Sequence, residues 1–116
     1  AARALIEELA GLECVAPGRT GSPLEIDVDR ALFWFGPDDV PFLAGLVGEP
    51  LVPFAADADG PLLIAPSGVV IALDGEWTSY TRYANAPDAL EQRLFRRNGR
   101  HAITKIAAAR RPPEYR

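Results

Sequence analysis

Acidic residues are the most numerous side chains that could do chemistry. Asp57 and Asp59 directly precede Gly60, a spacing found in the middle of a calcium-binding loop. Such a loop has glycine at its sixth position and carboxylates at its first and twelfth. Placing Gly60 sixth puts Ala55 first and Pro66 twelfth, and neither carries a carboxylate. We therefore expect a solvated turn between two strands and no metal site here.

Other metal chemistry is poorly supplied as well. The chain has one histidine, His101, and one cysteine, Cys14, whereas a structural zinc site needs four such ligands. A lone cysteine in a small apolar-rich chain is more often a buried small hydrophobe than a nucleophile. We expect no metal and no cofactor. The absence of a cysteine pair makes the cytoplasm the natural compartment.

Catalytic patterns are missing too. Ser22, Ser67 and Ser79 stand outside a G-x-S-x-G elbow, and no G-x-G-x-x-G or Walker pattern occurs. His101 lies in a basic stretch with nothing that marks it as a base. Spacing singles out no pair of acids for general acid–base work. The sequence predicts that the protein is not an enzyme and has no catalytic residue.

Charge is distributed unevenly. Residues 1–92 carry a net charge of −11 and residues 93–116 a net charge of +7. An acidic body disfavours nucleic acid, because phosphate contacts need a broad positive surface. It favours a basic protein partner through long-range attraction and complementary potentials. The basic end leaves an alternative open, namely a regulatory or nucleic-acid-associated module that acts through its C-terminal tail.

An aromatic and acidic stretch follows the central part of the chain. Trp and Tyr flanked by charge are typical of binding hot spots, although alternate members of such a stretch can simply pack in a core. The predicted partner-binding residues are Asp57, Asp59, Asp74, Glu76, Trp77, Tyr80 and Tyr83. The carboxylates are expected to steer the partner and the aromatic rings to anchor it.

A hairpin is the strongest structural signal. The apolar runs 62–65 and 69–73 flank Pro66, Ser67 and Gly68, which suit a type I turn followed by a glycine bulge. Neither run alternates with polar residues, so both faces of each strand need cover. Further strands are expected at 24–28, 51–55 and 76–83, with Pro53 indicating an edge or a bulge.

Helical signals surround these strands. A helix is expected before Gly11, a short one capped by Asp38 or Asp39, and a last one capped by Asn85 or the residues adjacent to it and stopped at residues 98–99. Residues 31–35 fit a strand or a short helix equally. The chain has no apolar run of about 18 residues, so no membrane span is expected. No signal peptide is evident, and because methionine is absent we expect natural residues before Ala1.

Several of these segments, read in order, resemble the SUKH superfamily and within it the third subfamily. Residues 10–12 match a helix that ends at Gly-Gly-Leu, and residues 48–55 match a "G-x-x-L-x-P-hydrophobic-G" segment. Residues 62–70 match the family hairpin, and Ala89-Leu90 its last helix. Ala55, Ala65 and Ile71 depart from the family pattern. The resemblance covers about residues 4–97, and its motifs are structural.

The resemblance agrees with an α+β domain in which a twisted, mainly antiparallel sheet with a central hairpin is flanked by an N-terminal and a C-terminal helix. Residues 1–97 would form this SUKH-like domain, and residues 98–116 a basic segment, docked or loosely ordered. It implies a non-catalytic immunity protein of a bacterial polymorphic toxin system. Its partner would be a secreted, basic toxin domain, commonly a nuclease or a nucleic-acid deaminase.

Overall fold

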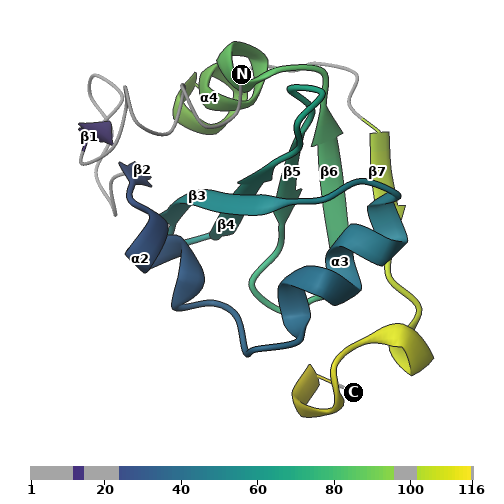
Figure 1. Ribbon diagram of the computed structural model, residues 1–116. Helices are drawn as coiled ribbons and strands as arrows, with labels where there is room; N and C mark the ends of the chain where they lie inside the picture. The colour runs from purple at the N-terminus through teal and green to yellow at the C-terminus, as the bar shows by residue number, and fades with distance from the viewer. Residues whose placement is uncertain (1–11, 15–23, 96–101, 116) are drawn as a thin grey trace.

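The computed structural model describes residues 12–14, 24–95 and 102–115, and its centre is a seven-stranded sheet. Each strand pairs antiparallel with the next along the chain, so sheet order follows sequence order (Figure 1). The strands are β1 (Leu12–Cys14), β2 (Leu24–Ile26), β3 (Val52–Asp57), β4 (Gly60–Ile64), β5 (Val70–Leu73), β6 (Ser79–Tyr83) and β7 (Ala102–Lys105). The predicted α+β class is confirmed.

The predicted hairpin is formed by β4 and β5. The Ala65 N–H donates to the Val69 carbonyl at 2.9 Å, and the Gly68 N–H donates to the Ala65 carbonyl, also at 2.9 Å. Gly68 has a φ of 92°, a conformation that glycine adopts without the steric cost of a Cβ. All residues of both strands are buried. The expectation that both faces are covered is confirmed.

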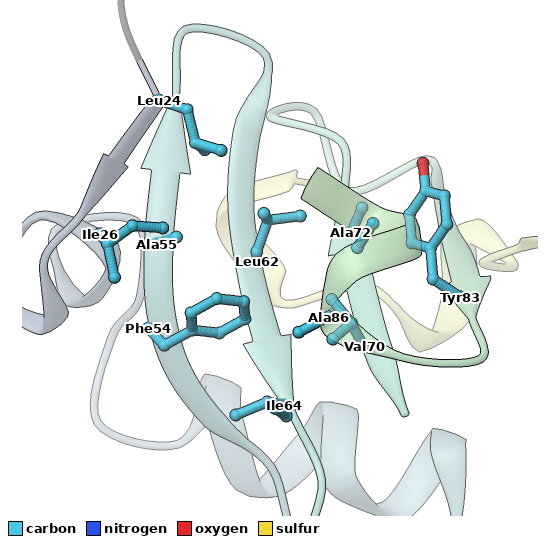
Figure 2. Packing of buried hydrophobic residues seen from close by; sticks show 11 residues of the cluster. Leu24, Ile26, Phe54, Ala55, Leu62, Ile64, Val70, Ala72, Tyr83 and Ala86 are labelled. Atoms are coloured by element: carbon cyan, nitrogen blue, oxygen red, sulfur yellow. The ribbon is translucent and has the colours of Figure 1, made fainter. Parts of the chain in front are cut away.

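Successive residues of the hairpin enter two different cores. Leu62, Ile64, Val70 and Ala72 face one core, which Ala86 of the last helix helps to close (Figure 2). The intervening residues, Leu63, Ile71 and Leu73 among them, face a second core on the opposite side of the sheet. Because side chains alternate between the faces of a strand, a hairpin that is apolar throughout must be covered twice.

Strand β3 contains the predicted irregularity. Its pairing with β4 shifts register between Pro53 and Ala55, and Phe54 and Ala55 therefore both enter the first core. Proline cannot donate to a sheet ladder, and a bulge is one of the places where a strand tolerates it. The bulge is confirmed, whereas β3 is an interior strand paired on both sides.

Three α-helices are described: α2 (Val28–Leu32), α3 (Asp39–Val47) and α4 (Ala86–Phe95). The ambiguous apolar run at 31–35 is therefore the end of a helix and the turn after it. Asn85 accepts the Asp88 N–H at 2.8 Å and caps α4 as predicted. Asp38 is the N-cap residue of α3, yet the Asp39 carboxylate accepts the Gly36 N–H at 2.6 Å. Helices α3 and α4 cover opposite faces of the sheet.

The basic C-terminal segment is docked. Strand β7 extends the sheet beside β6, and Ile106 donates its N–H to the Thr78 carbonyl at 2.9 Å. Two 3₁₀ turns follow, η1 (Ala108–Arg110) and η2 (Pro113–Tyr115). Ile106 and Tyr115 both pack in the second core. The predicted helix before Gly11 and the predicted stop of α4 lie outside the described residues.

Candidate functional site

The four predicted acids gather at one end of the sheet. Asp57 and Asp59 lie at the turn between β3 and β4, while Asp74 and Glu76 lie in the loop between β5 and β6. The Gly75 N–H donates to the Asp59 carbonyl at 3.2 Å, so turn and loop touch. An antiparallel meander returns to the same end after every second strand, which explains why residues 15 or more positions apart meet.

Asp74 holds the β5–β6 loop in shape. Its carboxylate accepts the backbone N–H groups of Thr78 and Ser79 at 2.8 and 3.1 Å, and both side-chain hydroxyls as well. Partial burial alone would raise the pKa of Asp74, but the hydrogen bonds from Thr78 and Ser79 together lower it below its ordinary value. The Asp74 carboxylate is therefore used by hydrogen bonds within the loop, and Glu76 is the exposed acid of this loop.

Trp77 contradicts the expectation of an exposed anchor, since its exposed fraction is 0%. Its ring contacts those of Phe35, Phe42 and Tyr115, with centroids 6.0, 6.1 and 5.4 Å away. Its φ of 61° is unusual for a bulky residue. The Asp74-centred loop turns the chain so sharply that Trp77 points into the second core and not to solvent.

Tyr80 and Tyr83 are buried as well, and the expectation that they lie exposed is also wrong. They stand on opposite faces of β6, Tyr80 in the second core and Tyr83 in the first. Burial raises the pKa of Tyr83 above its ordinary value, Arg93 opposes this, and Asp88 and Asp57 add to it. The alternative reading, in which the aromatic residues of 76–83 pack the core, is the one the structure has.

Asp57 is partly neutralised within the molecule. The Arg93 Nε of α4 lies 3.1 Å from a carboxylate oxygen of Asp57, and an Arg93 terminal nitrogen donates to the Gly60 carbonyl at 3.2 Å. Arg93 thus ties α4 to the β3–β4 turn. Of the four predicted acids, Asp57 pairs with Arg93 and Asp74 stabilises its own loop. Asp59 and Glu76 are exposed.

The exposed aromatic side chain that sequence reasoning missed is Phe33, with an exposed fraction of 87%. It follows α2, beside Leu32 at 45%. The signal was present: residues 31–35 are all apolar, and a helix that lies on a sheet buries only one of its sides. Ala31 is the buried member, so its neighbours Leu32 and Phe33 face water.

A groove lies beside Phe33, between α2, β2 and the end of β3. Its volume is about 400 Å³. We call it the acidic groove, and its lining residues are Glu25, Asp27, Asp29, Arg30, Phe33, Trp34, Ala56, Asp57 and Ala58. Four of these residues are acidic and one is basic. The groove therefore combines an apolar wall with a negative rim.

Local interactions fix the wall and rim of the acidic groove. The Asp27 carboxylate caps α2 by accepting the Asp29 N–H at 2.9 Å, and the Arg30 Nε lies 3.1 Å from a Glu25 oxygen. Trp34 lies against Gly75, where an added Cβ would sit 2.9 Å from the indole ring. This contact places the β5–β6 loop, with Glu76, next to the groove.

Metal-binding clusters and membrane-spanning helices are both absent from the residues that the structure describes. In that part of the chain no three His, Cys, Asp or Glu side chains are grouped closely enough to hold a metal ion. None of the helices described there is long and apolar enough to cross a membrane. Comparisons of the chain with models of protein families, with curated proteins and with solved structures found no match.

Proposed function

We propose that this chain is a non-catalytic immunity protein of the SUKH type, which binds and neutralises a basic toxin domain through the acidic groove. The observation that carries the proposal is Phe33, an almost fully exposed aromatic ring on the wall of a groove with a negative rim. Monomeric proteins rarely expose large apolar side chains in clusters without a partner. Phe33 and Leu32 are adjacent in the chain and both exposed.

Charge supports a basic partner. Glu25, Asp27 and Asp29 line the same groove as Phe33. Asp59 and Glu76 extend the same sign of charge across the neighbouring turn and loop. Toxins that act on nucleic acid carry basic clefts for phosphate, so an acidic inhibitor is attracted to the same cleft. Such attraction raises association rates and weakens with salt. The resemblance of residues 4–97 to SUKH proteins supplies the class of partner and a cytoplasmic site of action.

Rigidity also supports a binding role. The groove is built from the capped helix α2 and from β2 and β3 of the sheet, and the Asp74-centred loop, held by its own hydrogen bonds, lies beside it. A surface that is ordered before binding loses less entropy when the partner arrives. In this role Phe33 replaces Trp77, Tyr80 and Tyr83 as the anchor. The steering acids are Glu25, Asp27 and Asp29 of the groove together with Asp59 and Glu76.

Under this proposal the neighbouring gene should encode a secreted protein with a basic C-terminal toxin domain, and the test is neutralisation of that domain. Cells that express that domain should survive when the wild-type chain is co-expressed, and the two proteins should purify together. Phe33→Asp should lose both effects. Val52→Asp, a change at another exposed apolar residue, should keep both. Survival that needs neither Phe33 nor the groove acids would overturn the proposal.

A further inference from the structure

The outer edge of β7 is a second surface with features of a binding site. Among the strands that the structure describes, β7 is the last in the sheet, at its right-hand side in Figure 1. All four of its residues are exposed, and the apolar side chain of Ile103 has an exposed fraction of 67%. This edge lies away from the acidic groove, at the other end of the strand order.

The register shows which backbone groups face outward. Ile106 donates its N–H to the Thr78 carbonyl, and β6 and β7 pair Tyr80 with Thr104 and Thr81 with Ile103. Hydrogen bonding alternates along an antiparallel ladder. Ile106 and Thr104 therefore direct their backbone groups toward β6, while Ile103 and Lys105 direct theirs away from it. An added strand would find these outward groups in the spacing that it needs.

Hollows lie on both faces of this edge. One, of about 160 Å³, is lined by Leu46, Tyr80 and Thr104 on the α3 side. The other, of about 590 Å³, includes Ile103, Thr78 and Ser79. Consecutive side chains of an added strand point to opposite faces, so each hollow would receive alternate side chains. Main-chain bonds with alternating side-chain sites are the usual features of peptide recognition by strand addition.

Charge selects the kind of strand. Lys105 lines both hollows, Arg110 lines the smaller and Arg111 the larger. Lys105 and Arg110 are exposed, and charge-assisted hydrogen bonds to carboxylates are stronger than neutral ones. We propose that β7 accepts an extended acidic segment of a partner protein as an eighth strand, with carboxylates directed to Lys105 and Arg110. This site is separate from the acidic groove and does not depend on the function proposed for it.

The test uses the full chain and a blocked hexapeptide with two central glutamates flanked by valine and threonine. Addition to the edge should slow amide hydrogen exchange at Ile103 and Lys105 at least tenfold at saturating peptide, but leave Thr104 unchanged. Ile103→Pro should abolish this effect, because it removes an outward N–H and leaves the ladder to β6 intact; circular dichroism checks its fold. Lys105→Glu should weaken binding independently of any proline effect.

Three results would overturn the inference. The first is unchanged exchange at Ile103 and Lys105 with peptide in the millimolar range. The second is equal binding of a ten-residue thymidine oligonucleotide, which would make the edge a general polyanion surface. The third is a concentration-dependent dimer that Ile103→Pro dissolves, which would make a second copy of the chain the occupant.

Discussion

Tyr115, near the C-terminal end, stacks against Trp77 with the two ring centroids 5.4 Å apart and the planes tilted by 31°. This contact makes the C-terminal segment part of the second core. Tyr115→Ala should lower the free energy of unfolding by about 1–3 kcal/mol, less than a fully buried aromatic would lose, because Tyr115 is only half-buried. Urea denaturation followed by Trp fluorescence measures it.

The matched control for Tyr115 is Glu114→Ala, one residue away and exposed. It should change the unfolding free energy by no more than about 0.5 kcal/mol. Equal, small effects of both substitutions would show that the segment does not contribute to the core. The same contact bears on truncation, since a chain that ends at residue 97 would lose β7, Ile106 and Tyr115 together.

Gly60 should tolerate no side chain. Its φ is 140°, and an added Cβ would lie 2.2 Å from the Leu73 carbonyl oxygen. Gly60→Ala should therefore destabilise the fold by more than about 3 kcal/mol or prevent folding. Gly45 is a helical glycine with nothing within 4 Å of an added Cβ, and Gly45→Ala should stabilise the protein by about 0.5–1 kcal/mol. Thermal denaturation of both variants tests these two predictions. A stable Gly60→Ala protein would contradict the close approach of Gly60 to the Leu73 carbonyl.

Asp57 should matter for stability in addition to any role in binding. The Asp57 and Arg93 side chains are only 11% and 16% exposed, so Asp57→Asn leaves a largely buried guanidinium without its carboxylate. We expect a loss of about 2–4 kcal/mol. Glu25 and Arg30 form a pair that is 32% and 70% exposed, and Glu25→Gln should cost less than about 1 kcal/mol. Denaturant titration measures the free energy of unfolding of both variants. Equal losses for Asp57→Asn and Glu25→Gln would argue against the burial of the Asp57–Arg93 pair.

Asp74 should make stability depend on pH. Its pKa is lowered in the folded protein from an ordinary value of 3.8, so its carboxylate stabilises the fold above that pH. This contribution is lost as the pH falls from 3.8 through the lower folded pKa. Asp74→Asn should cost about 1–3 kcal/mol at neutral pH, and the gap to wild type should narrow in acid. Asp29→Asn, which removes an exposed charge, controls for net charge; a gap that widens in acid would contradict the prediction.

Much of the fold was predictable because its signals are local. Gly68 marks the turn of the hairpin, Pro53 the bulge and Asn85 the start of α4, and each acts through its own backbone or side-chain chemistry. The unbroken apolar runs of β4 and β5 require cover on both faces wherever they lie. The strand at the basic end, β7, was not predicted, because its four residues are all exposed and carry no alternating pattern.

The site was only partly predictable for a different reason. The exposure of Asp59 and Glu76 was predictable, because carboxylates are common in exposed turns. The burial of Trp77 was not predictable from its neighbours in the sequence. It depends on the positive φ of Trp77 in the loop that Asp74 and its hydrogen-bond partners hold. Phe33 was missed because the five adjacent apolar residues 31–35 do not reveal which of them the end of α2 and the turn after it leave in solvent.

The most direct measurement is the affinity for the basic toxin domain that the proposed function expects the neighbouring gene to encode. It is compared between the wild-type chain and Phe33→Ser by titration calorimetry at low and high salt. The groove predicts at least a tenfold loss of affinity for Phe33→Ser, about 1.4 kcal/mol, weaker binding of both proteins at high salt, and no loss for Val52→Ser, a change at an exposed apolar residue outside the groove. Full affinity of Phe33→Ser, independent of salt, would contradict the acidic groove as the binding surface.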